Sequence, residues 1–192
     1  TATDTLTMSS GRDTNVIGAQ ARAETVEADV GRNLAISSLQ DISNYDSKQR
    51  SQSVGVEIPI YGAGVPSGSY SQTKQTIDSK YQSVNEQSGI YAGKGGFDVT
   101  VKGHTQLDGA VISSTAPAEF NQLTTGSLGY SNINNQAEFS ANSSGMTIGG
   151  GNLLSATINL AASQIPASLN QDGSASSTTV SAVSPATITV AG

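Results

Sequence analysis

Few residues of this 192-residue chain can carry acid–base or metal chemistry. The chain has no cysteine, which excludes thiol catalysis and thiolate metal sites, and its one histidine is His104, beside Gly103. His104 could bind a metal only together with carboxylates, or act as a base for one of the many serines. The simpler interpretation is a solvated turn residue at a position where related stretches carry Arg12 and Arg32. We favour that interpretation.

Carboxylate pairs are the next candidates, because some stacked-strand proteins cleave polysaccharides with two acids from adjacent coils. Asp98 and Asp108 lie ten residues apart, which is half of the coil inferred below, so we expect them on different faces. No set of acids recurs at a full coil spacing. We therefore expect no catalysis in this segment, and we rank a polysaccharide-cleaving enzyme behind the non-catalytic alternatives.

Three glycine-rich stretches invite comparison with phosphate-binding loops: residues 62–64, 93–96 and 149–151. None has the P-loop or dinucleotide spacing, and none stands between a strand and a helix. Residues 95–98 have the glycines of a calcium-binding nonapeptide, but the Asp is at the wrong offset and the motif does not repeat. Tight turns explain all three stretches, and no cofactor or metal is expected.

The composition favours closely stacked strands. Charged residues make up 12% and aromatic residues 5%, with 21 glycines and five prolines. Disordered chains carry more charge and proline, and helical proteins carry more Lys, Glu and Leu. The formal net charge of -6 and the isoelectric point near 4.5 argue against nucleic acid as a partner.

A weak repeat indicates how the strands are arranged. Its unit is a short alternating strand, a glycine turn, an Asn or Gln, and an apolar residue that opens the next strand. Copies occur at residues 6–16, 29–36, 98–112 and 147–153. A coil of roughly 20 residues predicts an all-β solenoid, specifically a right-handed parallel β-helix, in which Asn15 and Asn33 could stack as an amide ladder.

Three departures interrupt this repeat. Residues 43–84 contain two long period-two stretches around a Gly/Pro turn, which predicts a protruding β-hairpin or loop insertion. Residues 118–142 form a shorter excursion, and residues 164–186 a looser, linker-like tail. The chain starts at Thr1 without a methionine, so we interpret residues 1–192 as one β-helical segment of a larger protein.

The insertion is the candidate contact surface. Its charges and apolar stripe are Lys48, Arg50, Val54, Val56, Ile58, Ile60, Lys74 and Lys80. The structural interpretation is that the charges protect exposed strand edges from aggregation. The functional interpretation is that this arm touches a partner, or that its apolar stripe inserts into a barrel or membrane. If the stripe packs on the flank of the solenoid, the insertion idea loses its basis.

Four strings carry a family resemblance. Residues 84–101 read VNEQSGIYAGKGGFDVTV, residues 103–114 read GHTQLDGAVISS, residues 123–133 read LTTGSLGYSNI and residues 176–183 read SSTTVSAV. They resemble the haemagglutinin-repeat region of filamentous haemagglutinin-like, two-partner-secreted exoproteins. The later repeat block of the contact-dependent growth inhibition proteins of Gram-negative bacteria is the most similar. The resemblance covers nearly the whole chain and is strongest over residues 80–135.

The resemblance implies a β-helical filament on the cell surface or secreted from it, exported through an outer-membrane two-partner secretion transporter. It implies that the segment presents a C-terminal toxin or helps to deliver it to neighbouring cells, with the target-cell surface or outer membrane as partner. The alternative is an adhesin or haemagglutinin module that binds a host or bacterial receptor or glycan. Exposed coil faces at the two ends add the expectation of end-to-end stacking.

Overall fold

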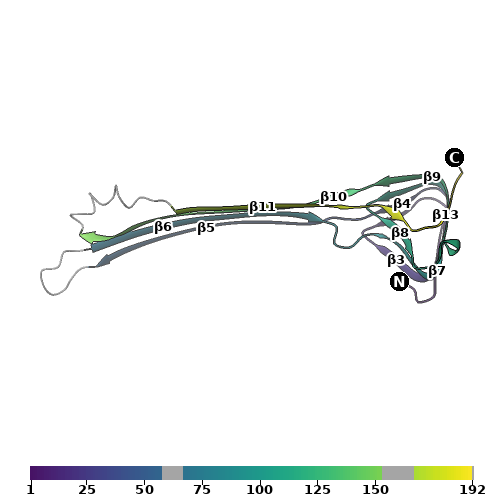
Figure 1. Cartoon of the computed structure of the whole chain (residues 1–192), viewed down its shortest axis with the longest axis horizontal. Coiled ribbons are helices and arrows are strands. Elements are labelled where there is room, and N and C mark those ends of the chain that lie inside the picture. The colour runs from purple at the N-terminus through teal and green to yellow at the C-terminus, as the bar shows by residue number, and fades with distance from the viewer. Residues whose placement is uncertain (58–66, 153–166, 192) are drawn as a thin grey trace. The chain divides into compact units, whose positions relative to one another are not determined.

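A computed structural model describes residues 1–57, 67–152 and 167–191 (Figure 1). The described residues form strands and one three-residue 3-10 turn, η1 (Ala118–Phe120), so no helix among them is long and apolar enough to span a membrane. The strands divide into a nine-stranded and a four-stranded sheet. The chain separates into two compact units. Unit 1 comprises residues 1–42, 82–136 and 176–192, and unit 2 comprises residues 43–81 and 137–175.

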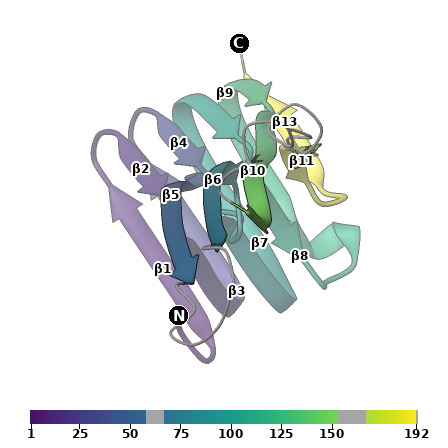
Figure 2. The same cartoon turned by 90° about the vertical axis from the view of Figure 1, so that its left-hand side faces the viewer.

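Unit 1 holds the nine-stranded sheet. Its strands are β1 (Thr5–Ser10), β2 (Thr14–Ile17), β3 (Gln20–Val30), β4 (Leu34–Ser37), β7 (Gly89–Asp108), β8 (Val111–Ser114), β9 (Gln122–Ser131), β12 (Ala182–Val183) and β13 (Thr187–Val190). The strand pairings in the described part of this sheet are parallel. Figure 2 shows these strands side by side, in colours that follow the chain from β1 to β9.

The parallel strands form three stacks that share β3, β7 and β9. One stack contains β1, β3, β7, β9 and β13, and a second contains β2, β4, β7 and β9. The third joins the start of β3 and of β7 to β8 and β12. Thr5 pairs with Thr25, so the first spacing is the predicted 20 residues. The prediction of an all-β fold with a parallel sheet is confirmed, whereas the closed right-handed β-helix stays a prediction.

Apolar side chains of neighbouring strands pack on one another in the core of unit 1. Val26 pairs with Phe97, Ile36 with Leu107 and Ile90 with Ile112, and each of these side chains is at most 1% exposed. Alternate residues of a strand point to one face, so each strand contributes every second side chain to this core. Because one layer of parallel strands, here called a rung, cannot bury its apolar side chains alone, packing against the neighbouring rungs removes these side chains from water.

The polar ladder predicted from Asn15 and Asn33 is wrong. Asn15 pairs with Ala35. Leu34 pairs with Thr14, so Asn33 stands opposite Asp13 and not opposite Asn15. Residues 93–96 are also not a turn. They lie inside β7, where its register against β3 shifts at a bulge.

The four-stranded sheet has the order β11-β10-β6-β5 and neighbouring strands point in opposite directions (Figure 1). Its strands are β5 (Asp41–Glu57), β6 (Ser67–Ser83), β10 (Ile133–Asn152) and β11 (Ala167–Thr179). Residues 43–57 and 67–81 therefore lie in two adjacent antiparallel strands, as expected of a hairpin. They do not stand alone, since β10 and β11 extend the same sheet.

The other two predicted departures take a different form. Residues 118–142 contain η1, all of β9, which belongs to the parallel sheet, and the start of β10. The described part of 164–186 contains β11 and β12 instead of a linker. Small uncharged residues look loop-like in sequence, but Ser and Thr also suit an exposed edge strand such as β11.

The side chain of Asn135 connects several chain segments of unit 1 by hydrogen bonds. Its Oδ1 accepts hydrogen bonds from Gln40 Nε2 (3.1 Å) and from the backbone N–H of Val84 (3.0 Å). Its Nδ2 donates to Ser177 Oγ (3.2 Å) and Thr179 Oγ1 (2.9 Å). Asn135 is buried, and these four bonds use the capacity of its amide. One side chain thus joins four chain segments that are distant in sequence.

Candidate interaction surfaces

The four predicted cations all lie on exposed positions of the four-stranded sheet. Lys48 and Arg50 belong to β5, an edge strand, whereas Lys74 and Lys80 belong to β6, an inner strand. Edge protection therefore applies to Lys48 and Arg50 alone. A role for any of them in contacting a partner stays a prediction.

Three close approaches between neighbouring strands show which residues share a face of this sheet. A Cβ on Gly55 would lie 2.8 Å from Ser69 Oγ, and a Cβ on Gly145 would lie 3.8 Å from Thr73 Oγ1. Odd-numbered residues of β5, β6 and β10 therefore face the same side. Ser140 Oγ donates to Asp172 Oδ1 (2.8 Å), which places even-numbered residues of β10 and β11 together on the other side.

The even-numbered side carries every charged residue among the side chains described in unit 2, and we call it the charged face. These residues are Asp46, Lys48, Arg50, Lys74, Asp78, Lys80, Glu138 and Asp172. Four are cationic and four anionic, so the face is balanced and not positive as the cations of 48–80 suggested. Lys48 Nζ lies 3.7 Å from Asp46 Oδ2, an exposed pair of small energetic weight. An open cavity of about 580 Å³ is lined by Asp78, Lys80, Glu138 and Asp172, among others.

The odd-numbered side is the uncharged face, defined as the odd-numbered residues of 43–55, 69–81, 137–145 and 171–175. It consists of Ser, Thr, Gln, Ala and Gly with a few larger apolar or aromatic side chains. Sequence reasoning missed this partition. The signal was present, since charges in residues 43–81 occur only at even numbers outside the Gly/Pro turn, apart from Glu57.

The predicted apolar stripe is described only at its start. Val54 is 72% exposed and belongs to the charged face. The side chain of Val56 and all of Ile58 and Ile60 lie outside the described residues. At Val54 the stripe does not pack on a core.

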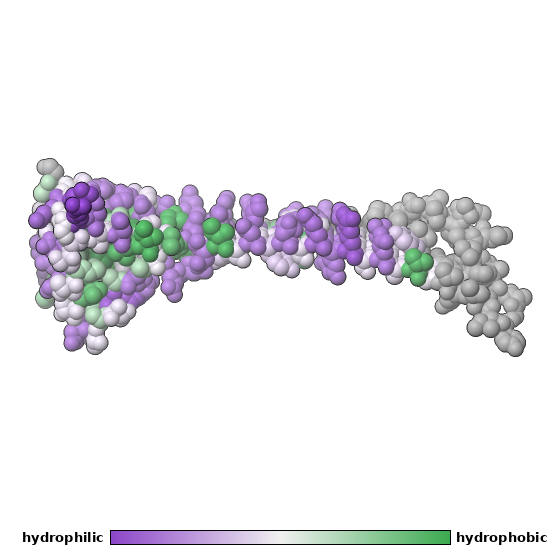
Figure 3. All heavy atoms as spheres, turned by 180° about the vertical axis from the view of Figure 1, so that it is seen from behind, coloured by the Kyte–Doolittle hydropathy of each residue, from purple (hydrophilic) through white to green (hydrophobic). Residues whose placement is uncertain are grey.

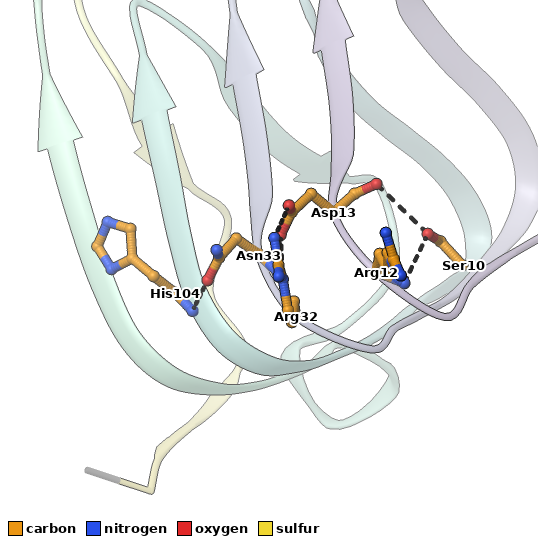
Figure 4. Close-up of polar contacts among 6 residues, drawn as sticks. All are labelled: Ser10, Arg12, Asp13, Arg32, Asn33 and His104. Atoms are coloured by element: carbon orange, nitrogen blue, oxygen red, sulfur yellow. Dashed lines mark hydrogen bonds and ion pairs between the residues drawn. The ribbon is translucent and has the colours of Figure 1, made fainter.

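His104 belongs to a ladder of corner residues in unit 1 (Figure 4). Asp13 Oδ1 accepts a hydrogen bond from the backbone N–H of Asn33 (3.2 Å), and Asn33 Oδ1 accepts one from the backbone N–H of His104 (2.9 Å). The next strand places Ser127 at the same position, opposite His104. It is Gly103, and not His104, that stands opposite Arg32, as the bond from Gly103 N–H to Arg32 O (2.7 Å) shows.

The imidazole of His104 is half-buried and bonded at both nitrogens. Its Nδ1 lies 2.7 Å from Ser127 Oγ and its Nε2 lies 3.1 Å from Gln106 Oε1. Gln106 Nε2 in turn donates to Asp108 Oδ1 (2.7 Å). The ring therefore replaces a corner carboxamide and is held from both sides, instead of being a freely solvated turn residue. The structure does bring a serine to His104, but the carboxamide oxygen of Gln106 stands where a nucleophile's base would need a carboxylate.

At the first rung of this ladder, Arg32 binds Asp13. Arg32 donates from Nε to Asp13 Oδ1 (3.1 Å) and from a second nitrogen to Oδ2. The hydrogen bonds from Arg32 are the main reason that the pKa of the Asp13 carboxyl lies below its ordinary value of 3.8, and the backbone N–H of Asn33 lowers it further. The same contact raises the pKa of Arg32. This corner is a structural ion pair.

Two acids that do not recur at the coil spacing in the sequence lie side by side in unit 1. Glu27 pairs with Asp98 in adjacent strands, and Asp29 lies two residues along β3. With Thr7 and Thr100 they line an open cavity of about 430 Å³. Glu27 and Asp98 are exposed, so neither has the apolar surroundings that a carboxylic general acid requires. Among the described residues no three His, Cys, Asp or Glu side chains are placed to hold a metal ion.

A smaller cavity of about 340 Å³ lies beside Arg22 and Tyr91. The Arg22 guanidinium stands over the Tyr91 ring, 4.2 Å from its centroid, and so occupies the aromatic face that a sugar ring would need. Burial raises the pKa of the Tyr91 hydroxyl, and the charge of Arg22 lowers it in part. This pair stabilises the wall of the cavity.

Comparison with known proteins places this geometry in a family context. Residues 1–55 match the family described as Hemagglutinin repeat. The chain is 48% identical over 182 residues to "Deoxyribonuclease CdiA" of Yersinia pseudotuberculosis serotype O:3, 47% over 186 residues to "Toxin CdiA" of Escherichia coli, and 44% over 188 residues to "tRNA nuclease CdiA" of Escherichia coli strain NC101.

These matches cover 94%, 93% and 97% of the chain but only 17%, 6% and 6% of the three relatives. The chain therefore spans a small part of the length of each relative. No solved structure matches it. The resemblance drawn from the four sequence strings is confirmed: the chain carries a hemagglutinin repeat in residues 1–55 and, over more than nine tenths of its length, is a homologue of one segment of the CdiA proteins.

Proposed function

We propose that this chain is a non-catalytic structural segment of a secreted exoprotein of Gram-negative bacteria, which presents a C-terminal toxin or helps to deliver it to neighbouring cells. The observation that carries the proposal is the variety of names among the relatives. A deoxyribonuclease and a tRNA nuclease both contain this stretch, at 48% and 44% identity to the chain. A segment shared by proteins named for different reactions serves a step that those reactions have in common, such as export, display or delivery.

The same proposal includes a right-handed parallel β-helix for unit 1. It is supported by the three stacks of parallel strands, by the 20-residue offset between β1 and β3, and by the buried side chains that stack rung upon rung. Such a rod separates its two ends by a fixed distance per rung, which suits a spacer. It would leave the cell through an outer-membrane two-partner secretion transporter and act at the surface of the target cell.

Within this function the arm is the proposed contact element. Lys48, Arg50, Lys74 and Lys80 are exposed on its charged face and are free of the buried networks that hold unit 1 together. The overall net charge of -6 supports a protein or carbohydrate surface as the partner in preference to nucleic acid.

A segment exchange tests the proposal without any change to the toxin. The matching residues of the Escherichia coli relative "Toxin CdiA" are deleted, or are replaced by this chain. We expect the deletion to abolish growth inhibition of target cells and the replacement to restore it, while toxic activity in lysates stays unchanged. Inhibition that survives the deletion would refute the proposal. A deletion that removes attachment to target cells would support the adhesin alternative, and nuclease or glycan-cleaving activity of the purified chain would refute its non-catalytic role.

A further inference from the structure

Within the part of the chain that the structure describes, no layer covers the four-stranded sheet of unit 2. None of the side chains described in residues 43–55, 69–81, 137–145 and 170–175 is buried. Sheets ordinarily bury one face against a second layer, since an isolated layer gains little from apolar burial. On the uncharged face, Tyr45 is 59% exposed and Phe139 42% exposed. The exposed aromatic side chains of the uncharged face therefore favour a partner that covers it.

The distribution of charge identifies which side that is. All eight charged residues described in unit 2 are on the charged face, and the uncharged face has none. Two sheets pack about 10 Å apart, so a charge on either inner face would be desolvated without a partner. Small side chains such as Ser71, Ala141 and Ser143 allow a second sheet to approach closely.

We propose that the uncharged face of unit 2 binds the same face of a second copy of this chain, forming a two-layer β-sandwich around a two-fold axis. The face is its own complement, because small polar side chains and a few aromatic rings can interdigitate with an identical set. Its size also fits. The face as defined comprises 40 strand residues, each ~4.8 Å by ~3.3 Å, which gives ~630 Å² per copy and ~1,300 Å² for the pair, at the lower end of the range of stable protein–protein interfaces.

A lipid surface fits this face less well. Most of its side chains carry a hydroxyl or amide group, such as Ser47, Gln49, Thr73 and Gln75. Placing such groups in hydrocarbon without hydrogen-bond partners is costly, whereas a facing sheet can supply partners. Figure 3 looks at this sheet from its edge and not onto the uncharged face, and on that side green atoms are isolated among purple and white ones.

Charge insertion on matched positions tests the proposal with the full 192-residue chain. Thr73→Lys with Ser143→Lys places two charges on the uncharged face of the inner strands. Thr76→Lys with Ser144→Lys makes the same residue changes on the same strands but on the charged face. By sedimentation velocity we expect the unchanged chain to dimerise, the first pair to weaken the dimer at least ~100-fold, and the second to change it less than ~3-fold.

Cysteine protection gives a second readout that does not depend on whether a charged variant folds. The chain has no cysteine, so Ser143→Cys and Ser144→Cys each introduce one thiol. Maleimide should modify Ser143→Cys more slowly as the chain concentration rises, and Ser144→Cys at a constant rate. A chain that stays monomeric at ~100 μM, or a dimer that survives Thr73→Lys with Ser143→Lys, would overturn the proposal. Binding of the monomer to phosphatidylcholine vesicles through this face would overturn it in favour of lipid.

Discussion

The backbone N–H of His104 donates to Oδ1 of Asn33 across neighbouring strands, 2.9 Å apart, although the two residues are 71 positions apart in the chain. The same arrangement joins Asn33 N–H to Asp13 Oδ1 at 3.2 Å. A side-chain oxygen at the corner of one rung thus accepts the N–H at the corner of the next. This satisfies backbone donors where the strands turn and the sheet ladder is interrupted.

Removal of one ladder oxygen should lower stability. We expect Asn33→Ala to reduce the free energy of unfolding by about 1 kcal/mol, because the N–H of His104 loses its acceptor at a partly solvated corner. Asn15→Ala is the matched control, since Asn15 is an exposed asparagine outside the ladder. Urea unfolding followed by far-UV circular dichroism measures both. Equal effects of the two changes would contradict the ladder.

The Asp13–Arg32 pair predicts a specific dependence on pH. Arg32 holds the pKa of Asp13 below 3.8 in the folded chain, so the pair contributes fully above the unfolded value and its contribution is lost as the pH falls through the folded value. Between about pH 5 and pH 2 the urea midpoint of the unchanged chain should therefore fall more than that of Asp13→Asn. A parallel decline of the two proteins would show that Asp13 does not carry this dependence.

The sequence repeat was sufficient to predict stacked strands and a 20-residue rung, because the spacing of apolar residues and glycine turns reflects burial directly. It was not sufficient to assign the partners within a rung. Asn15 and Asn33 lie 18 residues apart, and an offset of two residues moves each to a different rung position. The inserted residues 43–84 hide neighbouring residues from the sequence repeat more strongly than this offset does. Glu27 and Asp98 are direct neighbours, but the inserted residues separate them by 71 positions, which no search at the coil spacing can find.

The arm illustrates the opposite case. Its period-two pattern predicts the strands, but the four cations alone do not predict that the charged residues lie on even-numbered positions. In the single chain neither face of this sheet buries a described side chain, so hydrophobicity does not alternate and only charge distinguishes the faces. Lys74 belongs to the charged face and Thr73 to the uncharged face. Contacts between neighbouring strands are what show that odd-numbered residues of different strands share one face.

Close backbone approach at the ladder corner should make Gly103 intolerant of a side chain. A Cβ there would lie 2.5 Å from Arg32 O and 2.6 Å from Asn33 Oδ1, so the neighbouring rung would have to move. We expect Gly103→Ala to lower the free energy of unfolding by about 2 kcal/mol. Gly11→Ala, with no atom within 4 Å of its Cβ, should have little effect beyond that of backbone entropy. Thermal unfolding of both variants would decide, and equal midpoints would contradict the close contact.

Asn135 should be the most sensitive polar position among those considered. Its replacement by Ala leaves the Val84 N–H without its acceptor and the hydroxyls of Ser177 and Thr179 without their donor, at a buried site where water replaces them poorly. We expect a loss of about 3 kcal/mol in urea unfolding, against less than about 0.5 kcal/mol for Asn134→Ala. Asn134 is exposed and takes part through its backbone oxygen, which the substitution preserves. Because the amide of Asn135 joins β10 to β11 and to residues next to β5 and β6, its loss should also speed amide hydrogen exchange at Val84, whose backbone N–H it accepts. A global loss of stability without that local increase would mean that Asn135 does not hold these segments together.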